Sequence, residues 1–187
     1  MAFIQCAFKS DALGGETNFY MALPDNLENT KILYLLHGLS DGHTNWMRYT
    51  SVERFIRNRK FAVIMPDGGR SFYTDMKYGP AYYTYITSEL YDYVGKVFNL
   101  NQTNKNTFVA GLSMGGGHTT AATMLFPGVF DYSCPMSCGM RDGEGVDAQM
   151  QAIKKAGYKL YWIGCGTDDF AWPGTETMVE ILKRNGM

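Results

Sequence analysis

The sequence predicts an α/β fold in which a mostly parallel sheet carries helices on both faces. Short apolar runs alternate with helix-length segments along the chain, a pattern that is typical of parallel sheets with helical crossovers. Two of the runs, Lys31–Leu36 and Phe61–Met65, are almost continuously apolar, as strands buried on both faces are. The length of 187 residues suits one domain with a sizeable core, so we assign residues 1–187 to a single domain.

Seven strands are predicted from apolar runs that turn residues separate. The first two pair antiparallel through Gly14 and Gly15, and Pro66 ends the fourth. The fifth leads into a glycine-rich stretch, and a helix separates the last two. In chain order, the predicted strands are residues 2–8, 18–23, 31–36, 61–65, 107–111, 131–137 and 159–164.

Five helices are predicted between and after these strands. Thr50 and Glu53 have the spacing of a capping box, which starts the first helix. The second has apolar residues at every third or fourth position. The third begins with the small residues after Ser113, and the last ends at Asn185 and Gly186, which resemble a C-cap. The predicted helices are residues 50–59, 82–97, a segment from 114, 146–156 and 175–183.

The composition bears on the class of partner. Net charge is -1 with scattered Lys and Arg, so we expect no nucleic-acid partner. No apolar run is long enough to span a membrane. The first ten residues do not read as a signal peptide, which leaves a cytoplasmic location and secretion with the signal removed both open. No cluster of Cys, His and carboxylates has ligand spacing, so no metal or organic cofactor is implied.

The four cysteines, Cys6, Cys134, Cys138 and Cys165, match neither a zinc motif nor a redox pair. We therefore expect small buried apolar side chains at these positions. A disulfide between Cys134 and Cys138 in an oxidising compartment stays an alternative that the sequence does not decide.

Gly111-Leu-Ser-Met-Gly115 matches the G-x-S-x-G pattern of a nucleophile elbow. A serine on a tight strand-to-helix turn is forced toward a strained backbone, and the flanking glycines remove side chains that would clash there. The pattern alone is weak, but here it follows an apolar strand and precedes a helix. We predict Ser113 as the nucleophile and the N–H of Met114 as an oxyanion donor; a structural glycine turn is the alternative.

Two further predicted strands are followed by groups that suit this chemistry, a backbone N–H after one strand and a pair of carboxylates after the other. His37-Gly38-Leu39 leaves the carboxyl end of a parallel strand, where ligand sites gather. We predict the backbone N–H of Leu39 as the second oxyanion donor and only a strand-capping role for the His37 side chain. The strand after Lys159 ends in Asp168 and Asp169, either of which supplies a triad carboxylate or caps the next helix.

Five aromatic residues near strand ends are candidates for a substrate pocket, although packing in the core or in loops explains them equally well. They are Trp46, Tyr49, Phe72, Tyr73 and Trp172.

Taken with these residues, the chain resembles the esterase D-like branch of the α/β-hydrolases, which includes tributyrin-type esterases and feruloyl or acetyl-xylan esterases. The similar segments are YLLHGLSDGHTNWMRYTSVER, VIMPDGGRSFYTDMKYG, TFVAGLSMGGG and WIGCGTDDF, and they occur in the family's order over most of the chain. The resemblance implies Ser113 as nucleophile, Leu39 and Met114 as backbone oxyanion donors and Asp169 as the triad carboxylate.

The chain departs from this family in its histidines. In the family, the catalytic histidine lies beyond the carboxylate, after one more helix and strand, and the printed sequence has no counterpart of that segment. The three histidines present are His37, His43 and His118, and His118 is expected to point away from the Ser113 hydroxyl. We therefore expect a C-terminally incomplete domain that lacks the last strand and helix, exposes a sheet edge and forms homo-oligomers.

The resemblance implies a serine carboxylesterase acting on a small-molecule or carbohydrate ester, such as a short-chain acyl, hydroxycinnamoyl or acetylated sugar ester. Without a triad histidine this chain would be nearly inactive. Two alternatives remain: a non-catalytic ligand-binding scaffold, and a thioesterase of the S-formylglutathione hydrolase type that uses the same residues.

Overall fold

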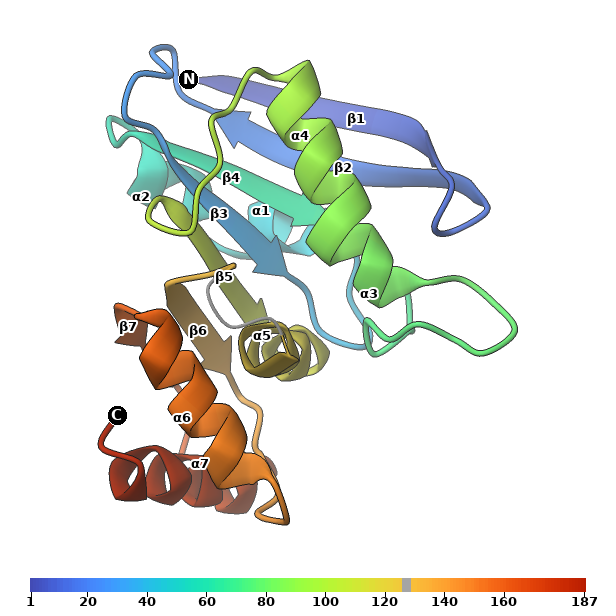
Figure 1. Cartoon of the computed structure of the whole chain (residues 1–187). Coiled ribbons are helices and arrows are strands. Elements are labelled where there is room, and N and C mark those ends of the chain that lie inside the picture. The colour runs from blue at the N-terminus through green and yellow to red at the C-terminus, as the bar shows by residue number, and fades with distance from the viewer. Residues whose placement is uncertain (126–128) are drawn as a thin grey trace.

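The computed structural model describes residues 1–125 and 129–187 and contains a seven-stranded mixed sheet (Figure 1). The strands are β1 (Ala2–Ser10), β2 (Gly15–Leu23), β3 (Lys31–Leu36), β4 (Phe61–Pro66), β5 (Thr107–Leu112), β6 (Tyr132–Met136) and β7 (Leu160–Tyr161). Their order across the sheet is β1-β2-β4-β3-β5-β6-β7. The first two strands pair antiparallel and β2 joins β4 antiparallel, whereas β4, β3, β5, β6 and β7 run parallel.

Helical segments lie on both faces of this sheet. They are α1 (Asn45–Tyr49), α2 (Val52–Ile56), α3 (Tyr82–Thr84), η1 (Tyr85–Glu89), α4 (Leu90–Val97), α5 (Met114–Leu125), α6 (Val146–Ala156) and α7 (Trp172–Arg184). The mostly parallel α/β architecture predicted from the sequence is confirmed. No helix of residues 1–125 and 129–187 has both the length and the apolar composition needed to cross a bilayer.

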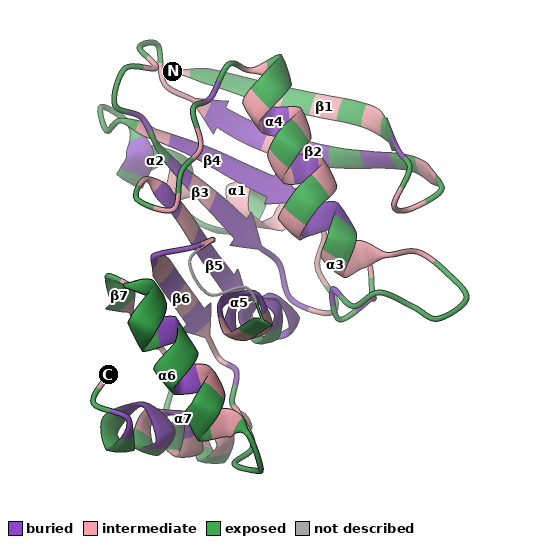
Figure 2. Ribbon diagram, viewed as in Figure 1, coloured by how far each residue is buried: buried purple, intermediate pink, exposed green. Residues whose placement is uncertain are grey.

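The alternation of side chains along the central strands produces two core layers. Ile32, Tyr34 and Leu36 pack on one face of the sheet against buried residues of η1, α4 and α5. Leu35 packs on the other face with Ile56 of α2, and Trp46 of α1 borders the same cluster. A third cluster joins α6 and α7 to the end of β6, so that purple stripes in Figure 2 mark one face of each of these helices.

Two predicted elements are shorter in the structure, and one helix is additional. The predicted helix 50–59 is shortened to α2. The Thr50 hydroxyl bonds to the carbonyl of Trp46 in the preceding helix α1, and Asn58 takes a left-handed conformation (φ +63°). Helix α1 itself was not predicted. The last strand is shortened to Leu160–Tyr161, and beyond it Gly164 still pairs with Met136 of β6 as an isolated bridge.

The four cysteines are all free thiols, so Cys134 and Cys138 form no disulfide. Only Cys138 is buried, whereas the other three are partly exposed, which corrects the expectation that all four are small core residues. Burial raises the pKa of the Cys138 thiol to about 11, which keeps it protonated at neutral pH.

Candidate active site

Ser113 occupies the turn between β5 and α5 and has φ = +53°, a left-handed conformation that is uncommon for serine. Its backbone is held at both ends, because Ser113 N donates to Met136 O at 2.8 Å and Ser113 O accepts from Gly117 N at 2.9 Å. A Cβ on Gly111 would lie only 2.3 Å from the carbonyl carbon of Gly115, so the turn requires these small residues. The sharp turn that the G-x-S-x-G pattern predicts is therefore present.

The loop after β3 packs directly against this turn. A Cβ on Gly115 would lie 2.7 Å from Leu36 O and 2.9 Å from His37 O, and a Cβ on Gly38 would lie 3.8 Å from the Cβ of Ser113. The missing side chains of these glycines therefore let the loop and the serine turn touch. Met114 is the first residue of α5, where a backbone N–H has no partner inside the helix.

The His37 imidazole fixes the direction of the peptide that follows Gly38. Gly68 N donates to His37 Nε2 at 2.8 Å, so the ring proton is on Nδ1, which donates to Gly38 O at 2.7 Å. In a trans peptide the carbonyl and the N–H point in opposite directions. By holding Gly38 O, His37 therefore turns the N–H of Leu39 away from its own ring, and no hydrogen bond within residues 1–125 and 129–187 uses that N–H.

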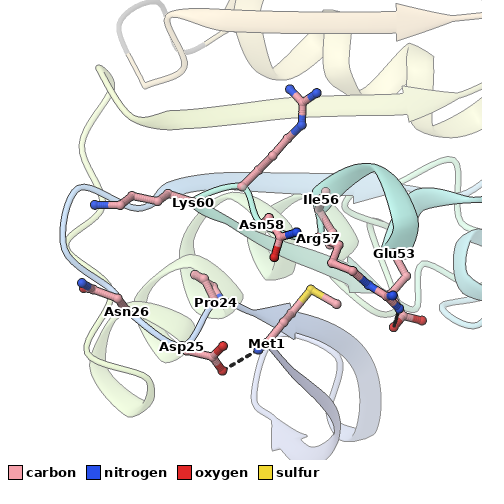
Figure 3. Close-up of a pocket in the computed structure, with 10 residues that line it drawn as sticks. Met1, Pro24, Asp25, Asn26, Glu53, Ile56, Arg57, Asn58 and Lys60 are labelled. Atoms are coloured by element: carbon pink, nitrogen blue, oxygen red, sulfur yellow. Dashed lines mark hydrogen bonds and ion pairs between the residues drawn. The ribbon is translucent and has the colours of Figure 1, made fainter.

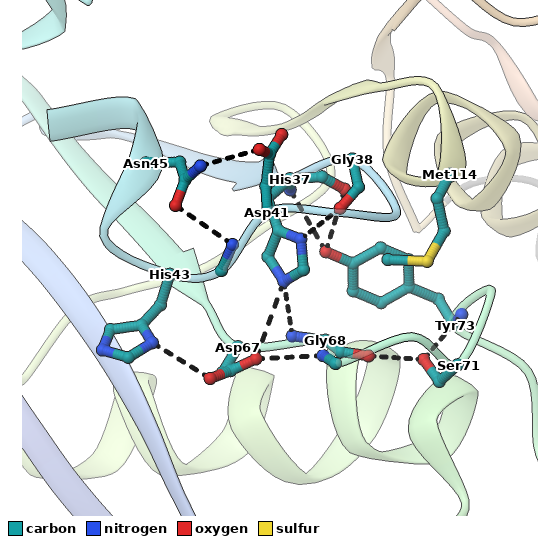
Figure 4. Close-up of polar contacts among 12 residues, drawn as sticks. His37, Gly38, Asp41, His43, Asn45, Asp67, Gly68, Ser71, Tyr73 and Met114 are labelled. Atoms are coloured by element: carbon teal, nitrogen blue, oxygen red, sulfur yellow. Dashed lines mark hydrogen bonds and ion pairs between the residues drawn. The ribbon is translucent and has the colours of Figure 1, made fainter. Parts of the chain in front are cut away.

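Tyr73 supports the same loop from beneath (Figure 4). Its hydroxyl accepts from His37 N at 3.1 Å and lies 3.4 Å from His37 O, and its ring fills the space beside Gly68, where a Cβ would be 2.2 Å from the ring. Tyr73 is 0% exposed, and burial raises its pKa well above the usual range, so the hydroxyl stays protonated. This corrects the expectation that Tyr73 lines a substrate pocket: its side chain is enclosed in the core.

Replacing Tyr73 with phenylalanine is expected to lower the free energy of unfolding by about 1–3 kcal/mol, because the buried N–H of His37 loses its partner while the ring packing is kept. Urea unfolding followed by circular dichroism measures this loss. Tyr78, which is 89% exposed, provides the control, since Tyr78→Phe should leave the unfolding midpoint unchanged. Equal midpoints for the Tyr73 variant and the native protein would contradict the supporting role.

The other two histidines are also engaged away from Ser113. His43 Nδ1 lies 3.1 Å from Asp67 Oδ2, on the opposite side of Asp67 from His37 (Figure 4). His118 is buried, with Nδ1 donating to Tyr73 O at 3.3 Å, and burial lowers its pKa to about 4. No hydrogen bond joins a histidine to Ser113 Oγ among the residues that the structure describes.

Asp169 lies in the loop that precedes α7 and is partly buried, whereas Asp168 is exposed. Asp169 Oδ1 accepts from Ala171 N at 2.9 Å, so the carboxylate shapes the turn before α7, although it does not cap the helix itself. Its second oxygen takes no hydrogen bond from the described part of the chain. The role of Asp169 as a triad carboxylate stays a prediction.

The remaining aromatic candidates fall in different places. Phe72 is 61% exposed, and its N–H points to Met114 Sδ at 3.2 Å, which places it beside the start of α5. Trp46 lines a pocket of about 130 Å³ that also includes Leu112, the residue before the predicted nucleophile. Trp172 lines a separate pocket of about 250 Å³ on α7 that shares no residue with the Trp46 pocket.

A larger pocket, of about 400 Å³, lies at the amino ends of the central strands and therefore away from Ser113 (Figure 3). Its charges are mostly satisfied within the chain. The amino group of Met1 pairs with Asp25, Arg57 Nη2 lies 3.6 Å from Glu53 Oε1, and Lys60 extends away from the centre of the pocket. We assign no role in the chemistry to it.

Neither the place of Asp67 in the site nor the supporting role of Tyr73 was predicted from the sequence. Asp67 follows β4 directly, at the same edge of the sheet as Ser113, and this position after a buried strand is the signal that would have indicated it. Tyr73 gives no such signal, because its contacts are with residues far away in the chain.

Comparisons with known proteins agree with this geometry. The model of the Esterase family matches residues 10–181. An acetyl esterase from Caldicellulosiruptor saccharolyticus is 31% identical over 128 residues, which cover 62% of this chain and 48% of that protein. The match thus spans about half the length of this curated relative.

Solved structures show the same fold. FphF, a fluorophosphonate-binding serine hydrolase of Staphylococcus aureus, aligns with a TM-score of 0.85 and 29% identity over 98% of this chain and 86% of its own. The S-formylglutathione hydrolase FrmB of S. aureus aligns with a TM-score of 0.81 and 30% identity over 99% and 87% of the two chains. A ferulic acid esterase of Anaeromyces mucronatus shares the fold: it aligns with a TM-score of 0.76 and 18% identity over 99% of this chain and 79% of its own. With the serine turn, the adjoining loop and a family match over nearly its whole length, the chain belongs to the Esterase family of α/β-hydrolases.

Proposed function

We propose that the protein is a serine carboxylesterase in which Ser113 attacks the carbonyl carbon of an ester. The observation that carries this proposal is the left-handed turn at Ser113, packed against the loop of Gly38. Such a turn presents a serine hydroxyl at the carboxyl edge of the sheet, next to the first N–H of a helix.

The proposed reaction proceeds through an acyl-enzyme. The oxygen of Ser113 bonds to the ester carbon, and the carbonyl oxygen becomes an oxyanion that the N–H groups of Leu39 and Met114 stabilise. The carbonyl then re-forms as the bond to the alcohol breaks, and the alcohol leaves with a proton. Water afterwards attacks the acyl group, which departs as a carboxylic acid and restores Ser113.

The proton of Ser113 needs an acceptor during the attack. His37 and His118 are buried and bonded to backbone carbonyls, and His43 pairs with Asp67. We infer that these histidines leave Ser113 without a base, so these residues alone turn over esters about a millionfold more slowly than a complete triad. A small base from solution should partly replace the missing acceptor.

Imidazole provides the test of nucleophile and base together. Hydrolysis of p-nitrophenyl acetate is followed for the native chain and for Ser113→Ala over a range of imidazole concentrations, with the protein-free rate subtracted. We expect both proteins to stay near the background without imidazole, and only the native chain to gain activity as imidazole is added. Equal rates for the two proteins at every concentration would show that Ser113 is not the nucleophile. Fast turnover without imidazole that is lost in Ser113→Ala would show that Ser113 is the nucleophile and that the protein does supply a base.

Thioester hydrolysis is the second candidate, favoured by the similarity to FrmB. It would use the same serine and the same backbone donors, so the residues do not separate the two reactions. Comparing acetyl-thiol and acetyl-alcohol esters of equal size under the imidazole conditions would separate them.

A further inference from the structure

A carboxylate oxygen without a partner lies beside the proposed nucleophile. Asp41 is half-buried in the loop between β3 and α1, and its Oδ1 accepts from Asn45 Nδ2 at 2.7 Å. Oδ2 receives no hydrogen bond from the described residues. Figure 4 shows the Asp41 carboxylate on the Asn45 side of the loop, turned away from the contacts among His37, Asp67 and Gly68.

Gly38 lies next to both this oxygen and Ser113. A Cβ on Gly38 would lie 3.1 Å from Asp41 Oδ2, 3.7 Å from Leu112 O and 3.8 Å from Ser113 Cβ. These distances place the Asp41 carboxylate and the Ser113 side chain beside the same glycine. A substrate bound at Ser113 would therefore lie near this carboxylate.

The Asp41 carboxylate is also part of the lining of the Trp46 pocket, which combines polar and aromatic side chains. Its lining residues are Asp41, Asn45, Trp46, Tyr49, Thr50 and Leu112. The volume of about 130 Å³ has room for about four groups of the size of a water molecule. The aromatic side chains offer apolar contact, whereas the Asp41 carboxylate oxygen accepts hydrogen bonds.

We propose that the Trp46 pocket binds the alcohol part of the ester and selects small alcohols that carry a free hydroxyl next to the esterified carbon, as glycerol does. The hydroxyl donates to Asp41 Oδ2, and the C–H groups of the alcohol pack on Trp46 and Tyr49. An anionic group at this position is disfavoured by the carboxylate. This assignment rests on the proposed esterase reaction at Ser113.

Two esters of similar size test the selection. Glycerol 1-acetate carries the neighbouring hydroxyl and propyl acetate does not. With imidazole supplied, we expect the native chain to prefer glycerol 1-acetate in kcat/KM by about 10-fold or more, and Asp41→Asn to lose that preference, because a hydrogen bond to a charged group contributes that much. Asp92→Asn, which removes an exposed carboxylate on α4, should keep the native ratio.

A binding measurement separates this proposal from the esterase reaction. Saturation-transfer NMR is recorded for both esters with the Ser113→Ala protein and with the Ser113→Ala, Asp41→Asn double variant. We expect glycerol 1-acetate to bind the first protein more tightly than propyl acetate does and to lose this advantage in the second. If binding depends on Asp41 but the native chain hydrolyses neither ester, the alcohol-binding role of the pocket is supported and the esterase reaction is refuted. Equal selectivity with and without the Asp41 carboxylate, in a variant whose urea unfolding is native-like, would overturn the proposal.

Discussion

Alanine at Gly115 is expected to lower the free energy of unfolding by about 3 kcal/mol, because its Cβ has no space. The added atom would lie 2.7 Å from Leu36 O and 2.9 Å from His37 O, and backbone atoms of a central strand and the loop that follows it cannot move aside cheaply. Relief of the clash would push α5 away from the loop after β3. The same substitution should therefore also remove the imidazole-dependent hydrolysis, because Leu39 and Met114 would no longer face the same carbonyl oxygen.

Gly117 supplies a control in the same helix. It is exposed, and a Cβ there meets nothing within 4 Å. Gly117→Ala should raise the stability by up to about 1 kcal/mol, because alanine is the better helix former. Urea unfolding of the two variants beside the native chain measures the contrast. Similar midpoints for Gly115→Ala and Gly117→Ala would mean that the serine turn and the loop are not in close contact.

Lowering the pH from 7 to 4 is expected to cost the protein stability on the order of 3 kcal/mol through His118 alone. Its pKa falls from the usual 6.5 to about 4 because the ring is buried. The unfolded chain therefore binds this proton more readily than the folded one. The stability that arises from this difference in the pKa of His118 is fully present above pH 6.5 and is lost as the pH falls toward 4.

The variant His118→Asn isolates this effect, since asparagine keeps a donor for Tyr73 O but does not titrate in this range. The variant will have a lower free energy of unfolding at pH 7. The measured quantity is the slope of the free energy of unfolding against pH between pH 6.5 and 4. We expect the slope of the variant to be clearly smaller than that of the native protein. Identical slopes would show that His118 is not buried as a neutral ring.

The sequence was most informative where structure depends on neighbouring residues. The turn at Ser113 is dictated by Gly111 and Gly115 on either side of it, so five consecutive residues were enough to predict it. The strand 31–36 and the helix 146–156 were predicted with the bounds that the structure shows, because continuous apolarity and helical spacing are local signals. The helix 82–97 is also confirmed, although its middle turn is the π-type segment η1.

Features that depend on distant residues could not be predicted in this way. Tyr73 was taken as a candidate for the substrate pocket, yet its hydroxyl reaches His37, which is far away in the sequence. The pairing of His43 with Asp67 joins the segments that follow β3 and β4, two strands that are neighbours only in the folded sheet. The regular ladder of β7 ends at Tyr161, and only an isolated bridge joins Gly164 to Met136. No periodicity in the sequence indicated this interruption.

The proposed reaction depends most on Ser113 as the residue that becomes acylated. The direct measurement is acid-quenched mass spectrometry of the native chain after mixing with p-nitrophenyl acetate and imidazole, with peptide mapping of the acetyl group. Ser137→Ala is the matched control, since Ser137 also follows a parallel strand with a left-handed backbone (φ +46°). We predict one acetyl group on Ser113 in the native chain and in Ser137→Ala, and none in Ser113→Ala. Acetylation of another residue, with Ser113 unmodified in every sample, would contradict the account.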